Sequence, residues 1–367
     1  MTASISSENI FKMCPCAGDK TYGESPLELI NYYESLPKNR YGDLLRIMAI
    51  PYLYHATEAI NDSATDAIEA YSKAVTDLLS YVKTTDVSGL KSILELAQGS
   101  DEFEQLEEQV ETHTGQHYGN LFKGFSDHSY FNEAKELLKT RLERNGIEIE
   151  NLKNKTVLDQ GCGGGRYTVA WSLLGAKECT GVDLSDIGLE DATKRVEAAK
   201  IKNVSFVKST VLNLPFEDDT FDIVYSNGVL HHTTDWKLGI AEQIRVLKPG
   251  GFGWQYLIEN PGGIQWDSIE ILRVITRNVN KNFARTVMKL LGIPANRIFF
   301  MLDHVMVPIN DRLTPMEIEN ELILNGAKNI KRLERGADFD GIEKIYNKIP
   351  FAEQKFGVGE NRFIFTK

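Results

Sequence analysis

Between about residues 155 and 259, short β-branched stretches alternate with longer stretches of helical periodicity. Residues 155–160 (KTVLDQ) are apolar and β-branched, residues 167–176 (YTVAWSLLGA) have helical spacing, and residues 178–185 (ECTGVDLS) again favour a strand. The alternation continues through a helix expected over residues 236–251, which we expect to end at its Pro-Gly-Gly. Strands separated by helices form a mostly parallel sheet with helices on both faces. The sequence therefore predicts an α/β fold.

Helical sequence lies on both sides of this alternating region. Residues 67–79 place apolar side chains three and four positions apart, as one face of a helix requires. After residue 259 the alternation stops, and several helices are expected before it resumes near residue 314. We therefore expect a helical N-terminal domain over residues 1–115 and an α/β domain over residues 116–367. The second domain would carry a helical insertion over about residues 261–313, above one end of the sheet.

Charge and hydropathy limit the classes of partner. The 367 residues carry a formal net charge of −11, whereas a protein that binds nucleic acid through its phosphates normally presents a basic face. No apolar run approaches the roughly 20 residues of a membrane span, and the N-terminus does not have the pattern of a secretory signal. Nucleic acid is thus an unlikely partner, no membrane association is expected, and the expected compartment is the cytoplasm.

The four cysteines do not form the pattern of a disulfide framework, which also fits a reducing compartment. Cys14 and Cys16 flank Pro15, and such a pair can bind a soft metal. No second Cys/His pair stands beside them at zinc-ligand spacing, so the sequence predicts no metal site and leaves the role of this pair open.

A glycine-rich loop follows the first expected strand, and its lack of Cβ atoms would let the backbone approach a ligand closely. It contains Gly161, Gly163 and Gly165, and Asp159 precedes it. A phosphate-binding loop would continue with Lys and Ser or Thr, but Arg166 and a tyrosine stand there. A dinucleotide fingerprint would need a glycine at the position of Arg166. An acidic residue would repel a pyrophosphate, but it suits a ligand that carries an ammonium group.

The second expected strand supplies an independent indication. It ends at Asp183, about twenty residues beyond the loop, where a carboxylate can accept hydrogen bonds from both hydroxyls of a ribose. Together, the acidic residues at the two strand ends indicate a ligand that has a ribose and a zwitterionic tail but no phosphates. S-adenosylmethionine has this composition.

Four segments in order now carry a family resemblance: VLDQGCGGGRYT, GVDLS, LPFEDDTFDIVYSNGVLHHTTD and RVLKPGG. They resemble the motifs of class I S-adenosylmethionine-dependent methyltransferases of the small-molecule type, closely over about residues 117–260 and loosely over the tail to residue 367. The resemblance implies a Rossmann-like, seven-stranded sheet and methyl transfer from S-adenosylmethionine, leaving S-adenosylhomocysteine. It does not extend to residues 1–115.

The resemblance also implies residue roles. Asp159 and the backbone of Gly161 and Gly163, in the loop that ends at Gly165, would hold the amino-acid end of the cofactor. Asp183 would bind the ribose. The remaining contacts would come from Leu184 against the adenine ring, Thr210 and Val211 at its edge, and the backbone of Asn227 at the ammonium group. Many relatives have an acidic residue at the position of Thr210, and a hydroxyl there is an uncharged acceptor.

Methyl transfer mainly requires alignment of the acceptor and exclusion of water, with a base where the acceptor carries a proton. We expect His232 to be this base rather than His231, and Tyr118 to assist it, because both positions resemble those of some phospho-base methyltransferases. A purely structural role for the histidine pair remains the alternative. Candidate residues of the acceptor pocket are His117, Tyr130, Trp266 and His304.

The acceptor is expected to be a small molecule. The alternative is a protein or tRNA recruited by the N-terminal helices, and a binding protein without turnover is disfavoured by the intact motifs. The sequence does not indicate the methylated atom or the oligomeric state.

Overall fold

The computed structural model describes residues 7–84, 90–97 and 125–367. The chain divides into two compact units, each built from several separate segments. One is a helical unit of Met1–Glu107, Gly262–Val307 and Ile349–Gly357, and the other is a sheet unit of Glu108–Pro261, Pro308–Lys348 and Val358–Lys367. Tyr118 and His117 lie outside the described residues.

The helical unit packs around two long helices and one apolar helix from the middle of the chain. Asn39 begins the longest helix by accepting a hydrogen bond from the backbone of Gly42, as an N-cap does. The helices are α1 (Ser7–Met13), α2 (Ser25–Ser35), α3 (Arg40–Asp62), α4 (Ala67–Thr84), α5 (Lys91–Leu96), α11 (Gly263–Thr276), α12 (Lys281–Leu290), α13 (Ala295–Met306) and α16 (Ala352–Phe356), with a 3₁₀ turn η1 (Pro15–Gly18).

The expected insertion does not pack as part of the α/β domain. Its first helix, α11, buries Ile269, Leu272 and Ile275 and lies against α2, α3 and α16 within the helical unit. Because α11 buries nine of its fourteen residues, it needs partners on most of its sides, and the N-terminal helices are among them. The structure thus groups α11–α13 with the N-terminal helices, and the expected boundary near residue 115 separates only part of the helical unit.

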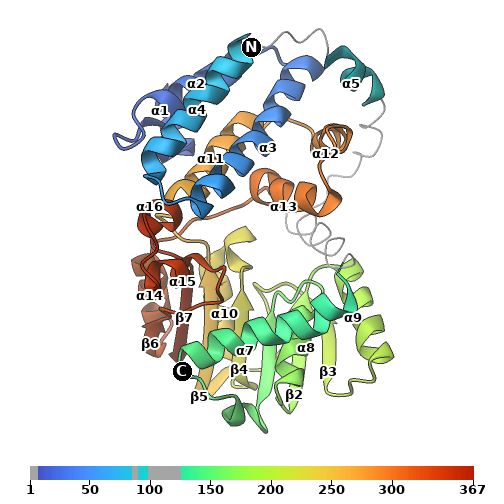
Figure 1. The fold of residues 1–367 in the computed structure, drawn as a ribbon. Helices are drawn as coiled ribbons and strands as arrows, with labels where there is room; N and C mark the ends of the chain where they lie inside the picture. Colours follow the sequence, from blue (N-terminus) through green and yellow to red (C-terminus); the bar gives the residue numbers. More distant parts are fainter. Residues whose placement is uncertain (1–6, 85–89, 98–124) are drawn as a thin grey trace. The chain divides into compact units, whose positions relative to one another are not determined.

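The sheet unit contains seven strands in the order β3-β2-β1-β4-β5-β7-β6. Strands β1 to β5 pair in parallel, and β7 is antiparallel to both of its neighbours. The seven-stranded, mostly parallel sheet expected from the sequence is therefore confirmed (Figure 1). The strands are β1 (Thr156–Gln160), β2 (Glu178–Asp183), β3 (Val204–Lys208), β4 (Phe221–Asn227), β5 (Leu247–Leu257), β6 (Lys328–Arg332) and β7 (Asn361–Thr366).

Helices cover both faces of this sheet because successive strand residues point to opposite sides. Val157 of β1 belongs to a core cluster with Leu138 and Trp171 from the helices of one face. Its neighbour Leu158 belongs to a second cluster, with Ile240 and Leu322 from the helices of the other face. The helices of this unit are α7 (Ala134–Arg144), α8 (Arg166–Leu173), α9 (Asp186–Ala198), α10 (Trp236–Val246), α14 (Pro315–Leu324) and α15 (Gly341–Tyr346), with short turns η3 (His128–Glu133), η4 (Ile149–Leu152) and η5 (Leu230–His232).

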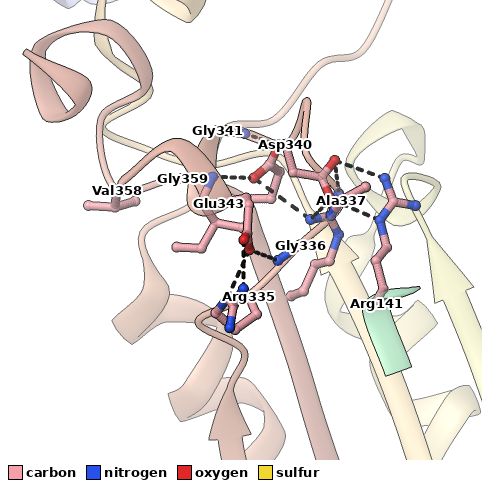
Figure 2. A network of polar contacts seen from close by, with 12 residues as sticks. Arg141, Arg335, Gly336, Ala337, Asp340, Gly341, Glu343, Val358 and Gly359 are labelled. Carbon is pink, nitrogen blue, oxygen red and sulfur yellow. Dashed lines mark hydrogen bonds and ion pairs between the residues drawn. The ribbon is translucent and has the colours of Figure 1, made fainter. Parts of the chain in front are cut away.

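A buried ion network joins α7, the start of α15 and β7 (Figure 2). Asp340 accepts hydrogen bonds from Arg141 at 2.8 and 2.9 Å and from Arg362 at 2.9 Å, and all three side chains are buried. Beside it, Glu343 pairs with Arg335 at 2.8 Å. Burial alone would raise the pKa of Asp340, but the charges of Arg362 and Arg141 outweigh it and hold this pKa below its ordinary value.

In the described part of the chain, no helix is both long enough and apolar enough to cross a membrane.

Candidate functional site

The site lies where the order of the strands changes direction. Strand β1 pairs with β2 on one side and with β4 on the other, and Asp159 is opposite Gly181 and Tyr225 in the two registers. The chain leaves β1 toward β2 and returns later to β4, and the helices that follow β1 and β4, α8 and α10, lie on opposite faces of the sheet. Ligands of open α/β sheets bind outside the carboxyl ends of the strands at such a switch point.

The loop after β1 requires its glycines for two physical reasons. Gly161, Gly163 and Gly165 have φ of 83°, 55° and 74°, a region that residues with a Cβ atom rarely adopt. A Cβ atom on Gly161 would also lie 2.3 Å from Val229, which follows β4. The glycines therefore allow a tight turn and a close approach between the two loops of the switch point.

Asp159, the penultimate residue of β1, is a buried carboxylate. It is 3% exposed, and its Oδ2 atom accepts a 2.6 Å hydrogen bond from the hydroxyl of Thr168 on α8. Burial raises the pKa of Asp159 to about 7; the bond from Thr168 opposes this rise and the negative charge of Asp183 adds to it. The carboxylate is thus held in a place that favours its neutral form unless a positive charge approaches.

Asp183 links the glycine loop to the end of β2. Its Oδ2 atom accepts a 2.8 Å hydrogen bond from the backbone of Gly163, and its Oδ1 atom accepts one of 2.9 Å from Ser185. Desolvation raises the pKa of Asp183, and these backbone bonds counteract part of the rise. Each carboxylate oxygen has further lone pairs, so the group can also accept from a ligand.

The charge of this site indicates what it can hold. Within residues 7–84, 90–97 and 125–367, no lysine, arginine or histidine forms a salt bridge with Asp159 or Asp183. Two neighbouring carboxylates without a cation repel a phosphate and attract an ammonium group. The residues therefore fit a zwitterionic nucleoside such as S-adenosylmethionine.

The other expected cofactor residues lie around the same strand ends. Leu184 is half-buried directly after β2. Thr210 accepts a 3.2 Å hydrogen bond from the backbone of Leu212 and thereby shapes the turn after β3. Val211 is 6% exposed and belongs to the core cluster beneath the sheet, so its backbone rather than its side chain is the part available to a ligand. Asn227 ends β4, and its side chain accepts a 3.4 Å bond from Trp254.

The two histidines after β4 have different surroundings. They lie on the 3₁₀ turn η5 rather than on an extended segment, and their ring centroids are 4.2 Å apart. His231 is buried, and its Nδ1 atom accepts a 3.3 Å hydrogen bond from the backbone of Ile258. His232 is half-buried, and its Nδ1 atom lies 2.8 Å from the carbonyl oxygen of Ile309. A carbonyl only accepts, so Nδ1 of His232 carries the proton and Nε2 is the basic nitrogen of the neutral ring.

Two residues that support the site carry a weaker sequence signal. Gln160 is fully buried and donates 3.0 Å hydrogen bonds to the carbonyls of Val211 and Gly239, which ties β1 to the neighbouring segments. An amide at the end of a strand that is otherwise expected to be buried is the signal that would have identified it. Tyr130, expected in the acceptor pocket, instead donates a 2.6 Å bond from its buried hydroxyl to the carbonyl of Gly164 in the glycine loop.

The remaining acceptor candidates lie in the helical unit. Trp266 and His304 are in edge-to-face contact with ring centroids 5.4 Å apart, and His304 also bonds to Tyr54. Burial lowers the pKa of His304, so its ring is neutral at physiological pH. These residues form a polar contact inside a helical core.

Residues 158–254 match the family of methyltransferase domains. Over these residues the chain carries a methyltransferase domain. The match runs from β1 to β5, so it contains the glycine loop, Asp183 and the histidine turn. It leaves the helical unit unassigned.

Similar proteins include other methyltransferases. The demethylmenaquinone methyltransferase of Staphylococcus aureus is 39% identical over 27% of this chain and 41% of its own length. The 27-O-demethylrifamycin SV methyltransferase of Amycolatopsis mediterranei is 29% identical over 49% of this chain and 65% of its own. A putative S-adenosylmethionine-dependent methyltransferase of Methanococcus maripaludis, of known structure, is 17% identical, with a TM-score of 0.41 over 72% of this chain and 96% of its own. The chain spans only 37% to 65% of the length of the first three curated relatives.

Proposed function

We propose that this protein binds S-adenosylmethionine at the carboxyl ends of β1 and β2 and transfers its methyl group to a small-molecule acceptor. The observation that carries the proposal is the pair formed by Asp159 and Asp183, joined through the glycine loop and lacking a salt-bridge partner among the described residues. When bound, the cofactor supplies a methyl group already activated by its sulfonium.

Different residues would bind different parts of the cofactor. Asp159 and the backbone of Gly161 and Gly163 would hold the amino-acid end, and Asp183 the ribose. The adenine would contact Leu184, Thr210 and the backbone of Val211, while the carbonyl of Asn227 would accept from the ammonium group. The positions of these residues around one switch point support this division.

His232 is our candidate for the base that removes a proton from the acceptor. Its hydrogen bond to Ile309 fixes the ring and leaves Nε2 as the nitrogen that can take a proton. Tyr118 remains a candidate partner. The relatives that act on demethylmenaquinone and on 27-O-demethylrifamycin SV support a small molecule as acceptor.

The cofactor is tested by isothermal titration of the purified protein with S-adenosylhomocysteine, NAD and ATP. We expect binding of the first alone. The variant Asp183→Asn should weaken it by about 1–3 kcal/mol, the scale of a lost hydrogen bond to a charged group. The matched control is Asp186→Asn, an exposed carboxylate of α9 that pairs with Lys208, which should leave the affinity unchanged. Binding of NAD or ATP in place of the nucleoside would refute the proposal.

The acceptor class is tested separately. Incubation with methyl-labelled cofactor and a cell extract, followed by fractionation, should place the label in the small-molecule fraction. Label in protein or tRNA would instead favour the alternative of a macromolecular acceptor. Loss of labelling in His232→Ala with an unchanged affinity for S-adenosylhomocysteine would agree with His232 as the base.

A further inference from the structure

Cys14 and Cys16 form a buried pair of thiols at the start of the helical unit. Their Sγ atoms are 3.0 Å apart, and their side chains are 0% and 5% exposed. Neither cysteine is in a disulfide bond. A disulfide bond is shorter than this separation by about 1 Å, so only a small side-chain movement divides the two states.

The local backbone holds the two sulfurs together. Cys14 has φ of −138° and ψ of 85°, the extended conformation that a following proline favours, and Pro15 then begins the 3₁₀ turn η1. Both ends of the pair are anchored. The backbone of Cys14 donates to Ile10 at 2.8 Å and accepts from Ala17 at 3.0 Å, and the carbonyl of Cys16 accepts from Asp19 at 3.2 Å.

The buried surroundings of the two sulfurs suit a dithiol and a disulfide equally, because both are uncharged. Cys16 lies 3.6 Å from the carbonyl oxygen of Asp267 on α11, and the Asp267 carboxylate accepts a 2.8 Å hydrogen bond from Tyr22. Tyr71 packs edge-to-face on Tyr22 at 5.4 Å. A dithiol and a disulfide are both uncharged, so either fits this dry environment without a counter-ion.

We propose that Cys14 and Cys16 are a reversible thiol–disulfide modification site, an inference that goes beyond the methyltransferase activity and does not depend on it. The oxidant is a low-molecular-weight disulfide such as glutathione disulfide. The thiolate of Cys16, the more exposed of the two, attacks this disulfide and releases one glutathione thiolate. The thiolate of Cys14 then attacks the Cys16 sulfur and releases the second.

The exchange is balanced in protons and electrons. Two protein thiols lose two protons and two electrons, and one small disulfide becomes two thiols. The proximity of Cys14 makes the second step intramolecular, so the mixed disulfide does not accumulate. Access from solvent requires local opening of the elements packed against η1, which are α1, α2 and α11.

The sequence provides a direct assay. Trypsin cleaves after Lys12 and Lys20, so residues 13–20 (MCPCAGDK) form one peptide with both thiols and no other cysteine. The folded, full-length protein is equilibrated with mixtures of reduced and oxidised glutathione, quenched with acid, alkylated and digested. We expect this peptide to lose the mass of two hydrogens and to escape alkylation as the oxidised fraction rises, while the peptides of Cys162 and Cys179 remain alkylated.

Two comparisons separate the proposal from unspecific oxidation. The chain unfolded in urea should require a glutathione mixture at least about tenfold more oxidising to form the same bond, because the fold no longer holds the sulfurs together. Cys179→Ala should behave like the natural protein, and Cys16→Ser should show no loss of two hydrogens. A peptide that stays doubly alkylated, or that carries glutathione as its end product, would overturn the proposal. This readout on the unaltered chain holds even where Cys16→Ser fails to fold.

Discussion

At the scale of single residues, the proposed role of Asp159 predicts that cofactor binding depends on pH. Its pKa is raised to about 7, first by burial, so below this value the carboxyl group is mostly neutral in the unliganded protein. An ammonium group favours the ionised form, so binding must release a proton there. The affinity for S-adenosylhomocysteine should therefore rise by about tenfold per pH unit up to about pH 7 and then level off.

Titration calorimetry between about pH 5 and pH 7.5 measures this dependence. Asp159→Asn should bind more weakly above pH 7 and show a nearly flat profile, since it has no proton to release. The stability of the unliganded protein changes with pH in the opposite direction to the affinity for the cofactor. A raised pKa of an acid means that the unliganded protein loses stability as pH rises from the ordinary value of 3.8 toward about 7. A natural protein with a flat binding profile would contradict this role of Asp159.

Tyr130 offers a second residue-scale prediction. Its buried hydroxyl donates to the carbonyl of Gly164, so Tyr130→Phe should leave that carbonyl without its partner. We expect a loss of about 1–3 kcal/mol in the free energy of unfolding, measured by urea denaturation, and weaker binding of S-adenosylhomocysteine. Tyr346→Phe is the control, because Tyr346 is 50% exposed in the same unit. Equal stability of the two variants would show that Tyr130 does not hold the glycine loop.

At the scale of elements, the ion network around Asp340 fastens α7 and β7 together. Asp340→Asn would remove the counter-charge of Arg141 and leave Arg362 only the carboxylate of Glu360, at 3.7 Å, which should cost about 3–5 kcal/mol. Asp338→Asn is the matched control two residues away, because its carboxylate is 88% exposed although it pairs with Arg144. Urea denaturation of both variants measures the difference, and similar midpoints would contradict the prediction.

The same network predicts a sensitivity to acid. The pKa of Asp340 is depressed, so its contribution to stability is complete above the ordinary pKa of 3.8 and is lost as pH falls through the lower folded value. The natural protein should therefore lose stability below about pH 4 more steeply than Asp340→Asn, which no longer has this group to protonate.

Elements near the glycine loop were the most predictable from sequence, because their pattern is local. Residues 155–160 gave β1 nearly to the residue, and Asp159 and Asp183 fall at strand ends as expected. The helix expected over residues 236–251 instead ends at Val246, and β5 begins at Leu247 and includes Pro249. The pairing of β5 with β4, whose register shifts between Phe221 and Ile223, decides where the helix ends and the strand begins. Such pairing joins segments far apart in the chain, so the local sequence does not indicate it.

At the scale of the whole molecule, the sequence predicted several helices after residue 259 but not their partners. Only the tertiary structure shows that α2, α3 and α16 lie against the first of them, α11. Similarly, the partners of Tyr130 and Gln160 come from distant segments. Local patterns therefore predicted the sheet and its strand ends, whereas the composition of the helical unit depended on contacts between segments far apart in the chain.

Because the helical unit is built from separate segments of the chain, the N-terminal helices cannot be removed as a separate domain. A chain that begins at Phe125 would still contain α11 but would lack α2 and α3, and buried residues such as Leu272 and Ile275 would face water. We expect this shortened chain to aggregate or to be cut by protease within residues 262–307, while the sheet unit resists digestion, because its core consists of its own residues. Limited proteolysis with mass spectrometry tests this against the full chain. A monodisperse shortened protein in which residues 262–307 resist protease would show that α11–α13 fold without the N-terminal helices.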